Sequence, residues 1–262
     1  HVASVRRRTF ASVPEPPLPQ PIDANLQRTG TGSRKWTKFK DAIPLWVADM
    51  DFHCPQPVVN AVKSVAEHGV YGYADPSPRL GPAVVDALCK TYGFDTVVDA
   101  NSEDAESQRA AVQKMIRWLP GLLPGLNHIV KAAQADPAWQ ETDSYLRGDP
   151  LAVAVATPIY YPFIAAPGNQ ANASLVEVPL LRRPLNDGTP NSDRIWRYEI
   201  DEQALESALQ REDVRVLLWC NPHNPTGRVW TRDEMRVVAR LCAENDVALL
   251  SDEVWADLVL DE

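Results

Sequence analysis

The second half of the chain alternates short apolar runs with segments of helical periodicity. Val214–Trp219 and Val247–Leu250 are apolar runs rich in branched residues, which is typical of strands buried on both faces. Between them, Thr231 and Glu234 have the spacing of a capping box, and apolar residues follow at helical intervals. This stretch therefore predicts one β-α-β unit.

The same patterns predict more elements of this kind upstream. Leu151–Ala156 and Ala173–Leu181 are expected to be strands, and Asp201–Gln210 a helix whose first residue is suited to the N-cap. Val112–Trp118 is also expected to be a strand, followed by a helix that opens at Pro120. Strands that alternate with helices predict an α/β fold with a doubly wound, mostly parallel sheet.

The first half of the chain is richer in helical patterns than in strand patterns. Pro55–Glu67 has apolar residues at helical spacing, and Gly69 follows as a helix stop. Leu80–Tyr92 has the pattern of another helix. Ile43–Ala48 is a short apolar run and is expected to be strand-like.

Composition excludes several classes of protein. The 262 residues, 45% of them hydrophobic, are enough for one large core or a domain and a half. The net charge of −9, with no basic cluster beyond residues 6–8, argues against a nucleic-acid partner. No apolar run approaches the roughly 20 residues of a membrane span. The four cysteines lack metal-ligand spacing, so we expect no metal site and buried thiols in a reducing compartment.

Polar residues follow two of the predicted strands. Asn224 lies in a loop dense in Asn, Pro and Gly after the first strand of the β-α-β unit, and Asp252 ends the second strand. Ligands of open α/β sheets bind beyond the carboxyl ends of the strands, so both side chains are expected in one crevice. No GxGxxG motif follows a strand, which argues against a nicotinamide-binding domain.

These motifs resemble a known family. NPHNPTG at 221–227, followed by a helix and SDE at 251–253, resembles the core of the fold-type I pyridoxal-phosphate (PLP) enzymes, the class I/II aminotransferase superfamily. GTGSRKWTKF at 30–39, IPLWVADMDF at 43–52, HGVYGY at 68–73 and CNPHNPTGRVW at 220–230 resemble its cystathionine β-lyase-like C–S lyase branch. The resemblance extends from about Asp23 to the last residue.

The resemblance implies that PLP is the cofactor and assigns residues to hold it. Main-chain amides of Gly121, Leu122 and Leu123, at a predicted helix start, would bind the phosphate. Tyr160 would stack on the pyridine ring, with Tyr161 as the weaker candidate. Two further residues would contact the ring, Asn224 by a hydrogen bond to its phenolate oxygen and Asp252 by a carboxylate facing its nitrogen. Glu253 is disfavoured, because neighbours on a strand point in opposite directions.

Four more residues receive roles from the resemblance. Trp255 occupies the position where the family often has Tyr or His on the ring oxygen; it either replaces them imperfectly or marks a different substrate pocket. Tyr73 would reach across a homodimer interface to the partner's cofactor phosphate, although a Tyr beside Gly is often plain packing. Asp49 and Asp51 would lie on the substrate side of the pocket, although a polar turn that caps the next helix is equally compatible with both.

The resemblance places the Schiff-base lysine a few dozen residues beyond SDE, and the last lysine of the chain is Lys131. We therefore expect a fragment that lacks this catalytic lysine and is inactive by itself. The complete enzyme would be a PLP-dependent C–S β-lyase that converts cystathionine or another cysteine S-conjugate into a thiol, pyruvate and ammonia. A class I/II aminotransferase acting on an amino acid and a non-catalytic degenerate homologue are the alternatives.

The expected organisation has three parts. Residues 1–22 would be a disordered tail or targeting remnant, 23–54 an N-terminal arm with part of the small domain, and 55–262 an incomplete PLP-binding large domain, with the C-terminal small domain absent. The expected compartment is the cytoplasm, with the Arg-rich start leaving a mitochondrial presequence open. The expected partners are a small amino-acid substrate and a second subunit, with no nucleic acid and no membrane.

Overall fold

The computed structural model describes residues 28–39, 42–73, 75–94, 105–170, 172–185, 188 and 195–258. The chain divides into two compact units, His1–Val84 and Val85–Glu262. The predicted tail at residues 1–22 lies outside the described residues. The predicted division after residue 54 stays a prediction.

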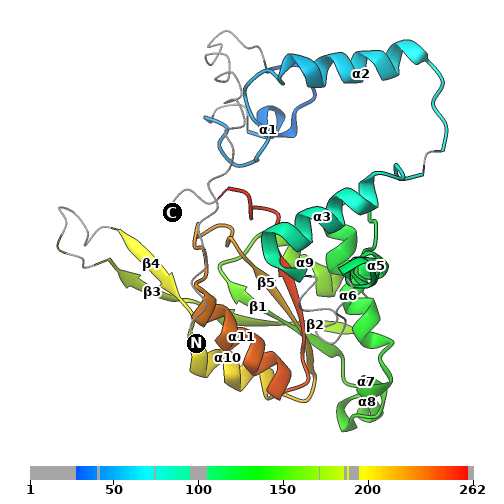
Figure 1. The fold of residues 1–262 in the computed structure, drawn as a ribbon. Helices are drawn as coiled ribbons and strands as arrows, with labels where there is room; N and C mark the ends of the chain where they lie inside the picture. The colour runs from blue at the N-terminus through cyan, green and yellow to red at the C-terminus, as the bar shows by residue number, and fades with distance from the viewer. Residues whose placement is uncertain are drawn as a thin grey trace. The chain divides into compact units, whose positions relative to one another are not determined.

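The second unit is built on a four-stranded sheet (Figure 1). Its strands are β1 (Leu151–Thr157), β2 (Ala173–Pro179), β5 (Val214–Cys220) and β6 (Ala248–Asp252), in the order β2-β1-β5-β6. Every neighbouring pair is parallel. The central strands β1 and β5 are buried almost throughout, as their continuous apolar sequences predict.

Helices cover both faces of this sheet. On one face, α10 (Glu202–Leu209) and α11 (Arg232–Glu244) bury their apolar sides against β1 and β5. On the other face, α6 (Leu122–Gln134) and α9 (Tyr161–Gly168) pack against the alternate side chains of the same strands. Two separate apolar clusters, one on each face, make this a doubly wound α/β fold, which confirms the predicted class.

Shorter elements complete the second unit. The helix α5 spans Ala105–Met115, and two helical turns, α7 (Pro137–Gln140) and α8 (Asp143–Arg147), lead into β1. The strands β3 (Leu181–Pro184) and β4 (Trp196–Glu199) form an antiparallel pair apart from the main sheet. The predicted capping box is present on α11, and Asp201 caps α10 as expected.

The first unit contains α1 (Arg34–Thr37) and α2 (Gln56–His68), and α3 (Leu80–Tyr92) spans the boundary between the units. The helix α2 ends at Gly69 in the left-handed conformation, as predicted. None of the α2 residues is buried. Its apolar side, which includes Val58, Val62 and Val65, is open to solvent.

The predicted strand at Val112–Trp118 is wrong. Residues up to Met115 belong to α5, and Val112, 2% exposed, packs against Val85 and Cys89 of α3. The apolar run is too short to distinguish a strand from the buried side of a helix. The preceding residues, AESQRAA, favour the helix.

The predicted strand-like run at Ile43–Ala48 is also wrong. These residues form no strand, and Ile43 and Leu45 are each 85% exposed. Pro44 lies inside the run and has no N–H to donate to a neighbouring strand.

Across the described residues, no helix combines the length and apolar character needed to cross a bilayer.

Candidate active site

The carboxylate of Asp252 is buried at the end of β6. Strand pairing sets Asp252 opposite Cys220 at the end of β5, and its side chain is 6% exposed. Its Oδ1 accepts a hydrogen bond of 3.0 Å from the Val254 N–H, and Oδ2 has no donor among the described residues. Burial raises the pKa of Asp252 above its ordinary value, against the opposing effect of the Val254 N–H. The site therefore holds a buried carboxylate whose Oδ2 can accept a hydrogen bond from a ligand.

Asn224 lies in the loop between β5 and α11, which is hydrogen-bonded to the end of β6. The loop is tied to β6 by the Asn221 N–H, which donates to the Asp252 carbonyl at 2.9 Å. The Asn224 carbonyl accepts from the Tyr160 N–H at 3.0 Å. Within the described part of the chain, the side-chain amide of Asn224 has no hydrogen-bond partner. The main chain of Asn224 is thus fixed while its amide is left for a ligand.

Tyr160 precedes α9 at the carboxyl end of β1 and is half-buried. Its ring packs edge-on against Tyr161, with 5.1 Å between ring centroids. Burial is the main cause that raises the pKa of Tyr160, with Tyr161 and the charge of Asp252 adding to it. Tyr160, Asn224 and Asp252 therefore come together at the carboxyl edge of the sheet, while Tyr161 is 61% exposed.

The start of α6 presents main-chain amides at the same edge. Gly121 has a φ of +134°, a backbone conformation that glycine adopts readily and other residues rarely do. No side chain caps the N-terminus of α6, so its first main-chain amides are free of a side-chain acceptor. The other end of α6 lies beside the amino ends of β5 and β6, where it lines a cavity with Arg215, Val247 and Ala248. Since α6 runs antiparallel to the strands, its N-terminus lies at their carboxyl ends. Leu122 packs in the same apolar cluster as Tyr160.

Trp255 lies in the turn directly after β6 and is half-buried. Its carbonyl accepts from the Leu258 N–H at 2.9 Å. The role of its indole toward a cofactor or substrate stays a prediction.

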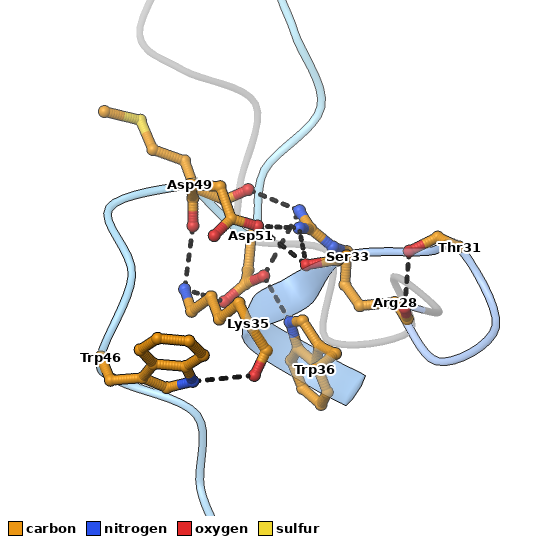
Figure 2. Close-up of polar contacts among 9 residues, drawn as sticks. Arg28, Thr31, Ser33, Lys35, Trp36, Trp46, Asp49 and Asp51 are labelled. Carbon is orange, nitrogen blue, oxygen red and sulfur yellow. Dashed lines mark hydrogen bonds and ion pairs between the residues drawn. The ribbon is translucent and has the colours of Figure 1, made fainter. Parts of the chain in front are cut away.

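Asp49 and Asp51 belong to a polar network within the first unit (Figure 2). Asp49 pairs with Arg28 and accepts from the Ser33 hydroxyl at 3.0 Å. Asp51 accepts from Lys35 Nζ at 2.8 Å and from the indole of Trp36 at 2.9 Å. These hydrogen bonds, that from Lys35 first, lower the pKa of Asp51.

Both carboxylates are thus already paired within the arm. Tyr73, in the same unit, is fully exposed. The roles of these three residues toward a substrate or a second subunit stay predictions.

Two residues near the site were not assigned a function from the sequence. His223, next to Asn224, is 2% exposed, and Cys220 opposite Asp252 is 2% exposed. Burial, the main cause, and the charge of Asp252 raise the pKa of Cys220 to about 11 against the opposing effect of the main-chain N–H of Asn224, so the thiol stays protonated. The polar sequence around His223 predicts an exposed side chain. Its burial depends on contacts with Trp230 and Thr226, which appear only in the structure.

Comparison with known proteins identifies the fold. Residues 152–262, which include β1, β5, β6 and the Asn224 loop, match the family model described as aminotransferase class I and II. This part of the chain is a class I/II aminotransferase domain. Its motifs NPHNPTG and SDE lie at the sheet edge where Tyr160, Asn224 and Asp252 meet, so the family recognised from the sequence is confirmed.

The aminotransferase domain and the residues before it also resemble individual proteins. Cystathionine β-lyase PatB of Bacillus subtilis is 32% identical over 245 residues, which cover 91% of this chain and 53% of PatB. Cystalysin from Treponema denticola, whose structure contains a pyridoxal 5′-phosphate cofactor, superposes with a TM-score of 0.62 at 27% identity, covering 87% of this chain and 50% of cystalysin.

A third relative is the PLP-bound C–S lyase of Staphylococcus hominis, complexed with the inhibitor L-cycloserine. It superposes with a TM-score of 0.64 at 28% identity, covering 89% of this chain and 51% of the lyase. The chain spans about half the length of the curated relatives and solved structures that it matches.

Proposed function

We propose that this protein is a PLP-dependent C–S β-lyase that acts on cystathionine or another cysteine S-conjugate and yields a thiol, pyruvate and ammonia. The observation that carries the proposal is the set of unsatisfied polar groups at one sheet edge: the Asp252 carboxylate, the Asn224 amide and the amides at the start of α6. The names of PatB, a cystathionine β-lyase, and of the Staphylococcus hominis C–S lyase support the choice of reaction class.

The residues present fit PLP. The free oxygen of a buried Asp252 suits a protonated ring nitrogen, and the uncapped α6 start suits a phosphate. Asn224 would donate to the ring oxygen, Tyr160 would stack on the ring, and Trp255 would close the site beyond β6. When bound, PLP supplies an electron sink for breaking a bond at the substrate Cα. The Asp252 carboxylate would keep the ring nitrogen protonated, and Tyr160 would hold the ring in one orientation.

We extend the proposal to the assembly. The protein would form a homodimer in which Tyr73 hydrogen-bonds the cofactor phosphate of the partner subunit, and its full exposure within its own unit leaves it available for this role. The turn at Asp49 and Asp51 would line the substrate side. Because both carboxylates are held by the arm, this turn would act through its shape and main chain.

A PLP titration tests the cofactor site. The absorbance of the bound cofactor, followed at increasing PLP, gives the dissociation constant for the protein expressed from its complete natural gene. Asp252→Ala should weaken binding at least tenfold, which corresponds to about 1.4 kcal/mol. Glu253→Gln is the control, since this exposed neighbour follows the end of β6 and its carboxylate accepts from the Ser251 hydroxyl at 3.0 Å. Equal dissociation constants for the two variants would overturn the site.

An aminotransferase is the second candidate, because the family model that matches the domain covers aminotransferases. Release of pyruvate and a thiol from cystathionine without added 2-oxo acid supports the lyase. Turnover that depends on a 2-oxo acid acceptor supports the aminotransferase instead. Tight PLP binding with neither activity would leave a non-catalytic homologue.

A further inference from the structure

His223 is a buried titratable group that the proposed chemistry does not use. Its ring is 2% exposed and packs edge-on against Trp230, with 5.5 Å between centroids and 71° between planes. Its Nδ1 lies 2.8 Å from the Thr226 hydroxyl, while Nε2 is buried and makes no hydrogen bond of normal geometry among the described residues, although the Ala156 carbonyl lies close enough to the ring to raise its pKa. Buried polar groups of this kind are rare enough to need a reason.

The main chain of His223 closes the loop that carries Asn224. The His223 N–H donates to the Arg228 carbonyl at 2.7 Å, and its carbonyl accepts from the Gly227 N–H at 2.8 Å. Asn224 is the next residue and receives the Tyr160 N–H. A shift of the His223 ring would therefore move the residue that presents the free amide and, through it, the start of α9.

The contacts of the ring indicate which nitrogen of His223 carries the proton. The Ala156 carbonyl raises the pKa of the ring and so faces a ring N–H; because Nδ1 lies against the Thr226 hydroxyl, this N–H is assigned to Nε2 and the Thr226 hydroxyl donates to Nδ1. Burial lowers the pKa of His223 to about 4, opposed by the Ala156 carbonyl, so the imidazole is neutral at neutral pH. A neutral ring that accepts at Nδ1 carries its proton on Nε2, toward the end of β1.

We propose that His223 is a positioning residue of the cofactor site: its imidazole, fixed between Thr226 and Trp230, sets the conformation of the 223–228 turn and thereby aims the Asn224 amide at the ring oxygen of PLP. The inference rests on the proposed function and adds a residue that acts only through Asn224. Trp230 is itself fixed, because its indole donates to the Cys220 carbonyl at 3.0 Å.

Three substitutions separate the parts of this role. His223→Leu keeps an apolar side chain against Trp230 and removes both ring nitrogens. His223→Asn keeps an acceptor near the Nδ1 position for the Thr226 hydroxyl. Thr226→Val removes the hydroxyl alone. In the protein expressed from its complete natural gene, we expect PLP binding about tenfold weaker for His223→Leu and for Thr226→Val, and within about threefold of wild type for His223→Asn.

The decisive comparison uses Asn224→Ala. A residue that acts through Asn224 has nothing left to position once the amide is gone, so adding His223→Leu to Asn224→Ala should not weaken PLP binding further. The absorption spectrum of bound PLP should also shift in the same direction in His223→Leu and in Asn224→Ala. Additive losses, or a spectrum unchanged by His223→Leu, would overturn the inference and leave a packing role.

Folding and function are kept apart by two controls. Urea unfolding of each variant checks that it is folded; if His223→Leu does not fold, Thr226→Val and the rescue by His223→Asn decide the matter. Wild-type protein that does not bind PLP refutes the proposed function. Wild-type protein that binds PLP and loses affinity with Asn224→Ala, but not with Thr226→Val, refutes only the role of His223.

Discussion

At the scale of single residues, Asp252 combines two opposing demands. Its burial disfavours the charged form, and the proposed ring nitrogen requires that form. Without a cofactor, the ionised carboxylate has one hydrogen bond and little solvent. The ionised carboxylate therefore carries a desolvation cost in the protein without PLP, and PLP in the proposed site would offset that cost by supplying a cationic donor.

The cost of burying this charge predicts that the stability of the protein depends on pH. The pKa of Asp252 in the folded protein lies above its unfolded value of about 3.9, so the folded state holds the proton more tightly. Stability from the neutral form is present at low pH and is lost as the pH rises through the folded-state pKa. Asp252→Asn keeps an oxygen for the Val254 N–H and removes the charge, so it should raise the stability of the PLP-free protein at pH 7.

Urea unfolding at several pH values between 4 and 8 measures this effect, with Glu253→Gln as the control. The stability advantage of Asp252→Asn should shrink toward pH 4. A constant difference across this range would contradict the assignment of the charge to Asp252.

Gly121 gives a second prediction at this scale. A Cβ at Gly121 would meet no atom within 4 Å, so only its φ of +134° opposes a larger residue. Gly121→Ala should reduce the free energy of unfolding by about 1–3 kcal/mol. Gly168→Ala is matched, since a Cβ there also meets nothing within 4 Å and its φ is not in the left-handed region. Similar unfolding midpoints for the two variants would show that a side chain at position 121 causes no backbone strain.

At the scale of elements, α11 begins with the most complete local signal in the chain. The Thr231 hydroxyl accepts from the Glu234 N–H at 3.2 Å, and the Glu234 carboxylate accepts from the Thr231 N–H at 2.7 Å. The same carboxylate pairs with Arg228 at the end of the His223 turn. The helix start and the Asn224 loop are therefore fixed by shared groups.

Removing the Thr231 cap should destabilise the start of α11 and the Asn224 loop. Thr231→Ala should lower the free energy of unfolding by about 1 kcal/mol, while Thr231→Ser keeps the hydroxyl and should stay close to wild type. Chemical denaturation of the two variants side by side gives the difference. If Thr231→Ala unfolds at the same urea concentration as Thr231→Ser, the cap contributes nothing to stability.

The comparison of pattern with structure differs between elements for physical reasons. The strand β5 and the cap of α11 could be predicted because the necessary information lies within a few consecutive residues. The helix at Val112 could not, because its burial depends on Val85 and Cys89, which are distant in sequence. The closeness of Asn224 and Asp252 followed from a rule about strand ends. The burial of His223 depends on Trp230 and Thr226, and no local pattern carries it.

At the scale of the molecule, the two units differ in how well they cover their apolar residues. The second unit buries two clusters, one on each face of its sheet, whereas α2 in the first unit buries no residue. Local opening is easiest where few apolar contacts must be broken. The first unit should therefore open before the second.

Limited trypsin digestion tests this difference with two exposed lysines on helices of equal length. Lys63 lies on α2 and Lys131 on α6, whose opposite side is buried against the sheet. Cleavage after Lys63 should be at least tenfold faster, as read by mass spectrometry of early fragments. Equal protection would mean that another surface covers α2 in the assembled protein, as the proposed homodimer would allow.

The indoles beside the cofactor site also have an optical consequence. Three indoles of the described residues are buried. Trp219 and Trp230 are 0% and 3% exposed, and Trp230 is bonded to the strand that leads into the Asn224 loop, whereas Trp139, 2% exposed, lies in α7. Trp118 and Trp196 are about half exposed. A chromophore that absorbs in the near ultraviolet and is bound at this sheet edge would quench the fluorescence of Trp219 and Trp230 by energy transfer. Tryptophan fluorescence should therefore report cofactor binding, because the blue-shifted part of the emission would decrease as PLP binds.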